Sequence, residues 1–314
     1  MMPLDIPGLD ITWDSTLRNV ILGSMILGLT SGVLGSFAVL RRQSLIGDAL
    51  AHAALPGICI MFMFTSTRSS ELLLLGGTLS GLLGTIVLIA ITRWSVVKEE
   101  TALGIVLSVF FGFGILLLTR IQHSGDAGQS GLDRFIFGQA ATILPRDVMV
   151  MAIVATVAIG LVVMMFKEFK IITFDPAYAA SIGMQPGFFG AVLAGLLVLA
   201  VMIGLQTVGV ILMVSLLIAP AVAARQWTSS LSGMVVLAGV FGMVSGVAGS
   251  VTSSLVDRLP TGPMIVIAAS IIVIVSLLFA PNRGVLSTFR SRQLRATRFK
   301  TELALADHHG VSKT

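Results

Sequence analysis

Residues 234–255 read MVVLAGVFGMVSGVAGSVTSSL, an apolar run without a charged side chain. A helix needs about 20 such residues to cross the hydrocarbon core of a bilayer. A membrane-spanning β-strand would instead alternate apolar and polar residues over about ten positions, and this run has no such alternation. Lipid offers no partners to backbone polar groups, whereas a helix satisfies them within one segment. The run therefore predicts a transmembrane helix.

The composition of the whole chain supports the same interpretation. The protein has 314 residues, of which 55% are hydrophobic and only 11% are charged, and its mean hydropathy is +1.00. Soluble globular domains carry about 25% charged residues, and disordered chains combine low hydrophobicity with high charge. A disulfide scaffold is excluded as well, because Cys59 is the single cysteine. The sequence thus predicts an all-α polytopic membrane protein.

Nine apolar runs are long enough to be considered as membrane spans. The sixth and seventh are separated only by residues 205–207, so counts of eight and ten stay open. The nine runs are Leu17 to Leu40, Leu45 to Phe64, Leu72 to Ile91, Leu103 to Leu118, Val148 to Phe166, Phe188 to Gly204, Val208 to Ala224, Met234 to Leu255 and Met264 to Ala280.

The charges near the ends of the chain suggest its orientation. Met1 to Trp13 carries acidic but no basic residues and is followed by a long apolar run, so we interpret the first run as a retained helix rather than a signal peptide. We divide the chain into a membrane domain, residues 1–282, and a basic tail, residues 283–314. Seven basic residues in the tail predict a cytoplasmic C-terminus. They are Arg283, Arg290, Arg292, Arg295, Arg298, Lys300 and Lys313. We attribute the basic isoelectric point to charges that flank the membrane, and predict lipid contact but no nucleic-acid partner.

One pair of ionisable residues lies inside a predicted span. Asp48 is the single acidic residue of the fifteen, and His52 the single histidine of the four, that falls within an apolar run. Their i, i+4 spacing places both side chains on one face of a helix, one turn apart. An ionisable residue at the centre of a span costs about 2.5 to 3.5 kcal/mol on insertion scales, and such residues usually mark transport pathways. The alternative is a structural role, in which the two side chains pair with each other or bond a neighbouring backbone.

The surroundings of the pair favour a functional site. Small alanines flank it, and Pro56 with Gly57 predicts a break of the helix one turn later, which a membrane tolerates where the backbone lines a cavity. A carboxylate with an imidazole suits Mn, Fe or Zn, whereas Ca or Mg would prefer oxygen ligands alone. We therefore predict that Asp48 and His52 form half of a site for a divalent transition metal.

A short helix is predicted in the loop between the fifth and sixth runs. Asp175 can cap its start, Pro176 suits its first position, and Gly183 suits the residue past its end. Such a helix can dock a partner protein or, alternatively, rest on the lipid surface through Tyr178.

The chain lacks the motifs of several enzyme classes. No glycine is followed by lysine, so the phosphate-binding loop G-x-x-x-x-G-K-[ST] is absent, and so are the G-x-S-x-G and H-E-x-x-H patterns. We predict no enzymatic activity in this chain, and any nucleotide hydrolysis must come from another chain.

Four stretches resemble the metal-type ABC permeases, the membrane subunits of bacterial manganese, zinc and iron importers. Residues 41–57 read RRQSLIGDALAHAALPG, which is similar to a signature of that family. Residues 175–184, residues 208–225 (VGVILMVSLLIAPAVAAR) and the DRLPTGP turn at 257–263 are similar in the expected order. Ala51 departs from the pattern, because the family often has serine there.

The resemblance implies a site, partners and a location. Asp48 and His52 match the intramembrane metal ligands of the family, and no cofactor is bound permanently because the Mn, Zn or Fe ion is the cargo. The implied partners are ATP-binding ABC subunits, an extracytoplasmic metal-binding protein and a second permease copy, identical or similar, in the bacterial cytoplasmic membrane. The implied coupling helix, which would insert into the ATPase, consists of Asp175, Pro176, Ala177, Tyr178, Ala179, Ala180, Ser181, Ile182, Gly183 and Met184.

We therefore expect this chain to be the membrane permease subunit of a binding-protein-dependent ABC importer that moves a divalent transition metal into the cell. One alternative is an ABC permease for a siderophore or cobalamin-type complex, whose metal travels with its ligands already filled. The other is a secondary ion transporter that uses Asp48 as a proton relay and needs no ATPase.

Overall fold

The computed structural model describes residues 15–43, 45–65, 70–123, 143–207, 209–255, 259–281 and 284. All regular structure in these residues is helical, in agreement with the predicted all-α fold. The helices are α1 (Ser15–Leu40), α2 (Ile46–Thr65), α3 (Ser70–Trp94), α4 (Glu99–His123), α6 (Pro145–Met164), α7 (Phe166–Phe174), α8 (Pro176–Ser181), α9 (Pro186–Thr207), α10 (Val210–Trp227), α11 (Leu231–Leu255) and α12 (Thr261–Phe279).

Each of the nine predicted runs corresponds to its own helix. Eight of these helices are long and apolar enough to cross a membrane, and α10 supplies a shorter apolar segment, Met213–Trp227. The sixth and seventh runs are separate helices, α9 and α10, because the chain turns at Gly209 with a φ of 82°. That backbone conformation suits glycine, which has no Cβ. The predicted boundary at residue 282 and the basic tail lie outside the described residues, apart from Gly284.

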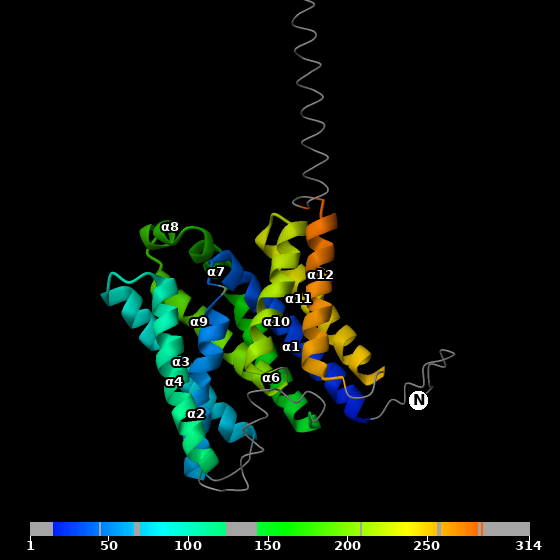
Figure 1. Ribbon diagram of the computed structural model, residues 1–314. Coiled ribbons are helices and arrows are strands. Elements are labelled where there is room, and N and C mark those ends of the chain that lie inside the picture. Colours follow the sequence, from blue (N-terminus) through cyan, green and yellow to red (C-terminus); the bar gives the residue numbers. More distant parts are fainter. Residues whose placement is uncertain are drawn as a thin grey trace, which may run out of the picture.

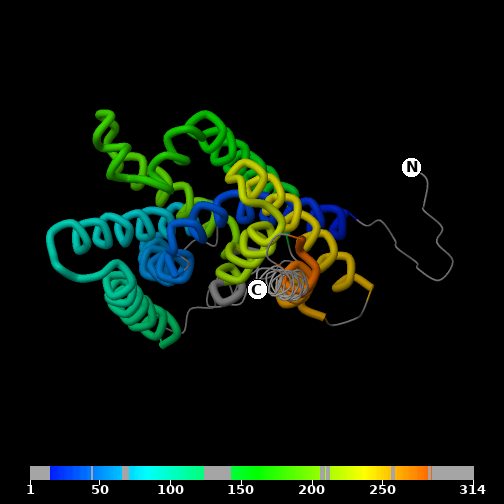
Figure 2. Tube along the Cα trace, turned by 90° about the horizontal axis from the view of Figure 1, so that it is seen from above, coloured from blue at the N-terminus to red at the C-terminus, as the bar shows by residue number. Residues whose placement is uncertain are grey.

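The helices form one bundle whose two ends differ (Figure 1). The end that carries α7 and α8, named here the α8 end, also holds the last turn of α12 (Figure 1). Seen along the bundle, α1 crosses the middle, with α3 and α4 on one side and α11 and α12 on the other (Figure 2). The chain therefore leaves its last span at the same end as α8, as the prediction of nine spans requires.

The centre of the bundle is a close crossing of α1 and α11, which make the most extensive helix pair. A Cβ added to Gly28 would lie 2.0 Å from the carbonyl oxygen of Gly242, and a Cβ added to Gly242 would lie 2.0 Å from that of Gly28. Such contacts let two backbones touch, which is how helices gain packing energy where lipid removes the hydrophobic drive. Small residues thus fix the position of α1 within the bundle.

Helix α2 differs from its prediction in one respect. It is continuous from Ile46 to Thr65 with Pro56 inside it, so the break expected at Pro56 and Gly57 is not an interruption of the helix. Pro56 has no N–H for the carbonyl of His52. The adjacent carbonyl of Ala53 accepts a hydrogen bond of 2.6 Å from the Ser80 hydroxyl of α3. Side chains from neighbouring helices commonly make proline tolerable within membrane helices in this way.

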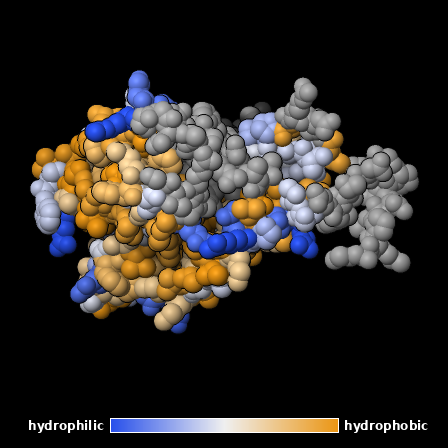
Figure 3. Space-filling model, turned by 90° about the horizontal axis from the view of Figure 1, so that it is seen from below, coloured by the Kyte–Doolittle hydropathy of each residue, from blue (hydrophilic) through white to orange (hydrophobic). Residues whose placement is uncertain are grey.

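Apolar side chains cover much of the described surface of the bundle. Viewed from the end opposite α8, hydrophobic residues predominate between small hydrophilic groups (Figure 3). On α12, for example, Ile267, Ile271 and Ile274 are all at least half exposed. A soluble domain would not leave such faces to water, so they are suited to lipid or to another membrane chain.

Candidate functional site

Asp48 and His52 meet on one face of α2, as their spacing predicted. The Nε2 atom of His52 lies 3.3 Å from Oδ1 of Asp48, and the two side chains remain 21% and 35% exposed, respectively. Asp48 stands in the first turn of α2, where the positive end of the helix dipole favours a carboxylate. Neighbouring alanines such as Ala51 and Ala53 are buried, so the pair is the polar part of an otherwise apolar segment.

The distance between the two ligand atoms fits a shared metal ion. Zinc lies about 2.1 Å from a histidine nitrogen or a carboxylate oxygen. Two such atoms 3.3 Å apart subtend an angle of about 100° at the ion, which lies between the octahedral and tetrahedral angles. The pair can therefore supply two adjacent ligands without a change of helix geometry.

The described residues provide only part of a coordination sphere. Within the described ranges, no group of three or more His, Cys, Asp or Glu side chains could hold a metal ion. Cys59 does not add a ligand to the pair, because it is buried and its Sγ lies 3.8 Å from the carbonyl oxygen of Gly114 in α4. A metal ion held by this pair would need further ligands from outside these described side chains, such as water or a second chain.

A ring contact to α4 was not foreseen from the sequence. The Phe111 ring packs on the imidazole of His52 with 4.5 Å between ring centroids and an interplanar angle of 73°. Phe111 was one of many phenylalanines in apolar runs, and only the packing of α4 against α2 distinguishes it.

A polar network ties the start of α2 to other helices at the α8 end. Gln43 donates a hydrogen bond to the Glu99 carboxylate at the first position of α4. Burial lowers the pKa of Arg41, and the nearby Glu99 carboxylate acts in the opposite direction. Arginine stays charged in proteins, so Arg41 remains cationic. The guanidinium nitrogens of Arg41 also lie over Gly190 of α9, 3.5 and 3.7 Å from where a Cβ would stand.

Helix α8 forms as its capping pattern predicts. The Asp175 carboxylate accepts a hydrogen bond of 2.8 Å from the backbone N–H of Tyr178, Pro176 opens the helix, and Gly183 follows it with a φ of 83°. Ala179 is buried, while Tyr178 and Ile182 are about half exposed. Helix α8 lies at the periphery of its end of the bundle (Figure 1), and Tyr178 and Ile182 are exposed there.

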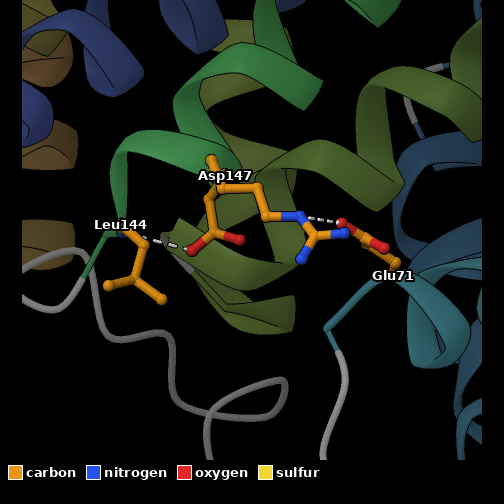
Figure 4. Close-up of polar contacts among 4 residues, drawn as sticks. Glu71, Leu144 and Asp147 are labelled. Carbon is orange, nitrogen blue, oxygen red and sulfur yellow. Dashed lines mark hydrogen bonds and ion pairs between the residues drawn. The ribbon is translucent and has the colours of Figure 1, made fainter.

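An ion pair joins two helices at the opposite end. Nε of Arg146, at the start of α6, lies 2.5 Å from Oε1 of Glu71, at the start of α3. The next residue, Asp147, accepts a hydrogen bond of 3.2 Å from the backbone N–H of Leu144 and so caps α6 (Figure 4). Both members of the ion pair are well exposed, and exposed pairs contribute little to stability. We assign this pair no role in the site.

Comparisons with known proteins agree with this all-helical, multi-pass architecture. A zinc transport system membrane protein, TroC, from Treponema pallidum (strain Nichols) is 56% identical over 274 residues, which are 87% of this chain and 92% of that protein. A manganese transport system membrane protein, MntC, from Bacillus subtilis (strain 168) is 48% identical over 295 residues, 94% of this chain and 68% of that protein. The solved structure of PsaBC from Streptococcus pneumoniae in complex with Fab aligns with a TM-score of 0.77 at 30% identity, covering 88% of this chain and 96% of that chain.

The helical bundle is that of a multi-pass membrane protein, and the relatives above are named as transport system membrane proteins. The sequence model of the ABC 3 transport family matches residues 13–280. The chain belongs to this family.

Proposed function

We propose that this chain is the permease subunit of an ABC importer that moves a divalent transition metal, Mn, Zn or Fe, across the membrane. The observation that carries the proposal is the 3.3 Å separation of His52 Nε2 and Asp48 Oδ1 within an apolar bundle. The names of the relatives support it, because they are zinc and manganese transport system membrane proteins. A carboxylate and an imidazole do not distinguish Mn from Zn or Fe, so the cargo is defined here only by its class.

We further propose that two permease copies enclose one translocation path. One chain offers two ligands, and a second copy related by a two-fold axis would offer the same two. Four ligands satisfy the coordination that zinc prefers. Asp48 and His52 are partly exposed on the single chain, which leaves them accessible to such a partner. A different but similar permease chain can fill this role if it carries an equivalent pair.

Helix α8 is our proposed contact with the ATPase. Its exposed Tyr178 and Ile182 can enter a groove of a partner. At the same end of the bundle, Arg41 lies just before α2 and interacts with Glu99 of α4. In this arrangement the C-terminus is cytoplasmic, and the metal-loaded binding protein approaches the opposite end. ATP-driven closure of the ATPase would then move the helices around Asp48 and His52 between outward and inward exposure.

The proposal predicts the behaviour of a double variant, Asp48→Asn with His52→Ala. Proteoliposomes that contain the permease, its ATPase and the metal-loaded binding protein should lose ATP-dependent Mn²⁺ and Zn²⁺ uptake, because both ligands are gone. Assembly with the ATPase, measured by size-exclusion chromatography, should persist because α8 is unchanged in this variant. Uptake equal to that of the wild type would refute the site assignment.

Two further arms of this experiment separate the alternatives. Uptake of free Mn²⁺ or Zn²⁺ without the ATPase would indicate a secondary transporter. Stimulation of the ATPase by a chelated metal, but not by the binding protein loaded with unchelated Mn²⁺ or Zn²⁺, would indicate a permease for metal complexes. The proposal expects neither result.

A further inference from the structure

We propose that Phe111 of α4 is a positioning residue for His52. Its ring would hold the imidazole in the orientation that directs Nε2 toward Asp48, so that both ligands meet one metal ion. This inference rests on the proposed function, because it concerns the geometry of the same site.

The imidazole of His52 has two restraints in the structure. Asp48 lies 3.3 Å from Nε2 and therefore restrains one atom of the ring. The Phe111 ring lies against the imidazole at a centroid separation of 4.5 Å and an angle of 73°, which is an edge-to-face contact. The torsion about the Cβ–Cγ bond of histidine is broad and roughly two-fold, so packing must select its value. A half rotation would exchange Nε2 with a ring carbon and would remove the nitrogen from Asp48.

The position of Phe111 is itself fixed by the seam between α2 and α4. Three residues beyond Phe111, a Cβ added to Gly114 would lie 2.9 Å from the Leu55 side chain. Leu55 in turn stands three residues beyond His52. Residues three apart share a helix face, so the contacts His52–Phe111 and Leu55–Gly114 belong to one seam with one register. The Sγ atom of Cys59 extends this seam with its contact to the carbonyl oxygen of Gly114.

Loss of the ring should weaken the site without removing a ligand. An aromatic pair contributes about two- to tenfold in an equilibrium constant beyond the area it buries. We therefore expect a Phe111→Leu variant to bind metal about two- to tenfold more weakly than the wild type. The altered orientation of the imidazole should also change the coordination geometry of the bound ion.

The test uses the complete complex of permease and ATPase with Co²⁺ as the probe. Visible absorption of bound Co²⁺ reports the coordination geometry, and titration gives the affinity. Phe111→Leu should weaken binding and shift the absorption bands, whereas Phe111→Tyr keeps the ring and should restore both. A second ring-removing variant, Phe111→Met, repeats the measurement if the leucine variant fails to assemble. Phe113→Leu is the matched control, because Phe113 is 49% exposed on the same helix and has no ring partner in the described part of the chain.

The outcomes separate this inference from the proposed function. If His52→Ala abolishes the Co²⁺ signal, Phe111→Leu shifts the absorption bands and Phe113→Leu leaves them unchanged, the metal site and the role of Phe111 are both supported. If His52→Ala abolishes the signal and Phe111→Leu matches the wild type in spectrum and affinity, the role of Phe111 is refuted and the metal site stands. If His52→Ala leaves the signal unchanged, the metal site itself is refuted, and the role of Phe111 with it.

Discussion

At the scale of single residues, the site depends on how α2 accommodates a proline. Pro56 cannot donate a hydrogen bond to the carbonyl of His52. This missing bond weakens α2 in the turn that follows His52, the proposed ligand. The helix nevertheless continues to Thr65. The Ser80 hydroxyl binds the carbonyl of Ala53 at 2.6 Å, and Gly57 lies close to Gly76 of α3. Helix α3 therefore supports the turn of α2 that carries His52.

This support can be measured with Ser80→Ala. Interhelical hydrogen bonds in membrane proteins contribute about 0.6 kcal/mol on average, so the free energy of unfolding should fall by about that amount. Thr78→Val is the matched control, because the Thr78 hydroxyl binds the carbonyl of Leu74 in its own helix at 2.7 Å and joins no second helix. Unfolding of the purified permease in mixed detergent micelles gives both values. Equal values for the two variants would contradict the proposed role of Ser80.

At the scale of helices, the crossing of α1 and α11 should be the most sensitive packing contact. Gly242→Ala would place a methyl group 2.0 Å from the carbonyl oxygen of Gly28, and a backbone atom cannot move aside as a flexible side chain can. Overpacking of this kind costs about 1 to 3 kcal/mol. Gly160→Ala in α6 is the control, because its Cβ would meet nothing within 4 Å.

Thermal unfolding of the two alanine variants in the same detergent checks this expectation. Gly242→Ala should lower the midpoint by several degrees, and Gly160→Ala should leave it nearly unchanged. A small change in both would mean that α1 and α11 separate easily, and that their close contact is not what positions α1.

The sequence predicted helices well because lipid imposes a simple requirement. Every apolar run that can cross a bilayer must close its own backbone hydrogen bonds, so the nine runs became nine helices. Helix α7 was missed because three charged residues, Lys167, Glu168 and Lys170, interrupt the apolar pattern. One face of that helix is nevertheless buried, through Phe169 and Ile172. The continuity of α2 was missed because it depends on Ser80 and Gly76, which belong to another helix.

The candidate site was predictable only where its members share one helix. Asp48 and His52 are one turn apart in the sequence, so their spacing alone places them together. Phe111 reaches His52 from α4, and Glu99 of the same helix reaches Gln43 before α2. No local pattern indicates which residues of α4 face α2. The 25 residues of α4 are apolar around much of the helix, so periodicity does not select a face.

At the scale of the whole molecule, the proposed function requires two chains to act as one. A single chain supplies two ligands, and among the described residues no third His, Cys, Asp or Glu joins them. If the ion is held between two copies, a copy without ligands should inactivate its partner. If each chain transports alone, the partner should keep its own activity.

Mixed complexes distinguish these two cases. Wild-type chains and chains with Asp48→Asn and His52→Ala, expressed in equal amounts, would pair at random in a two-fold assembly. ATP-dependent Mn²⁺ uptake should then fall to about one quarter of the wild-type rate, because only pairs of two wild-type chains keep all four ligands. Mixtures of wild-type and Phe113→Leu chains should keep full uptake and thereby control for expression. Uptake of about one half would instead contradict the shared site. It would show that each wild-type chain transports with its own pair of ligands, or that each chain pairs with a different permease that was not altered.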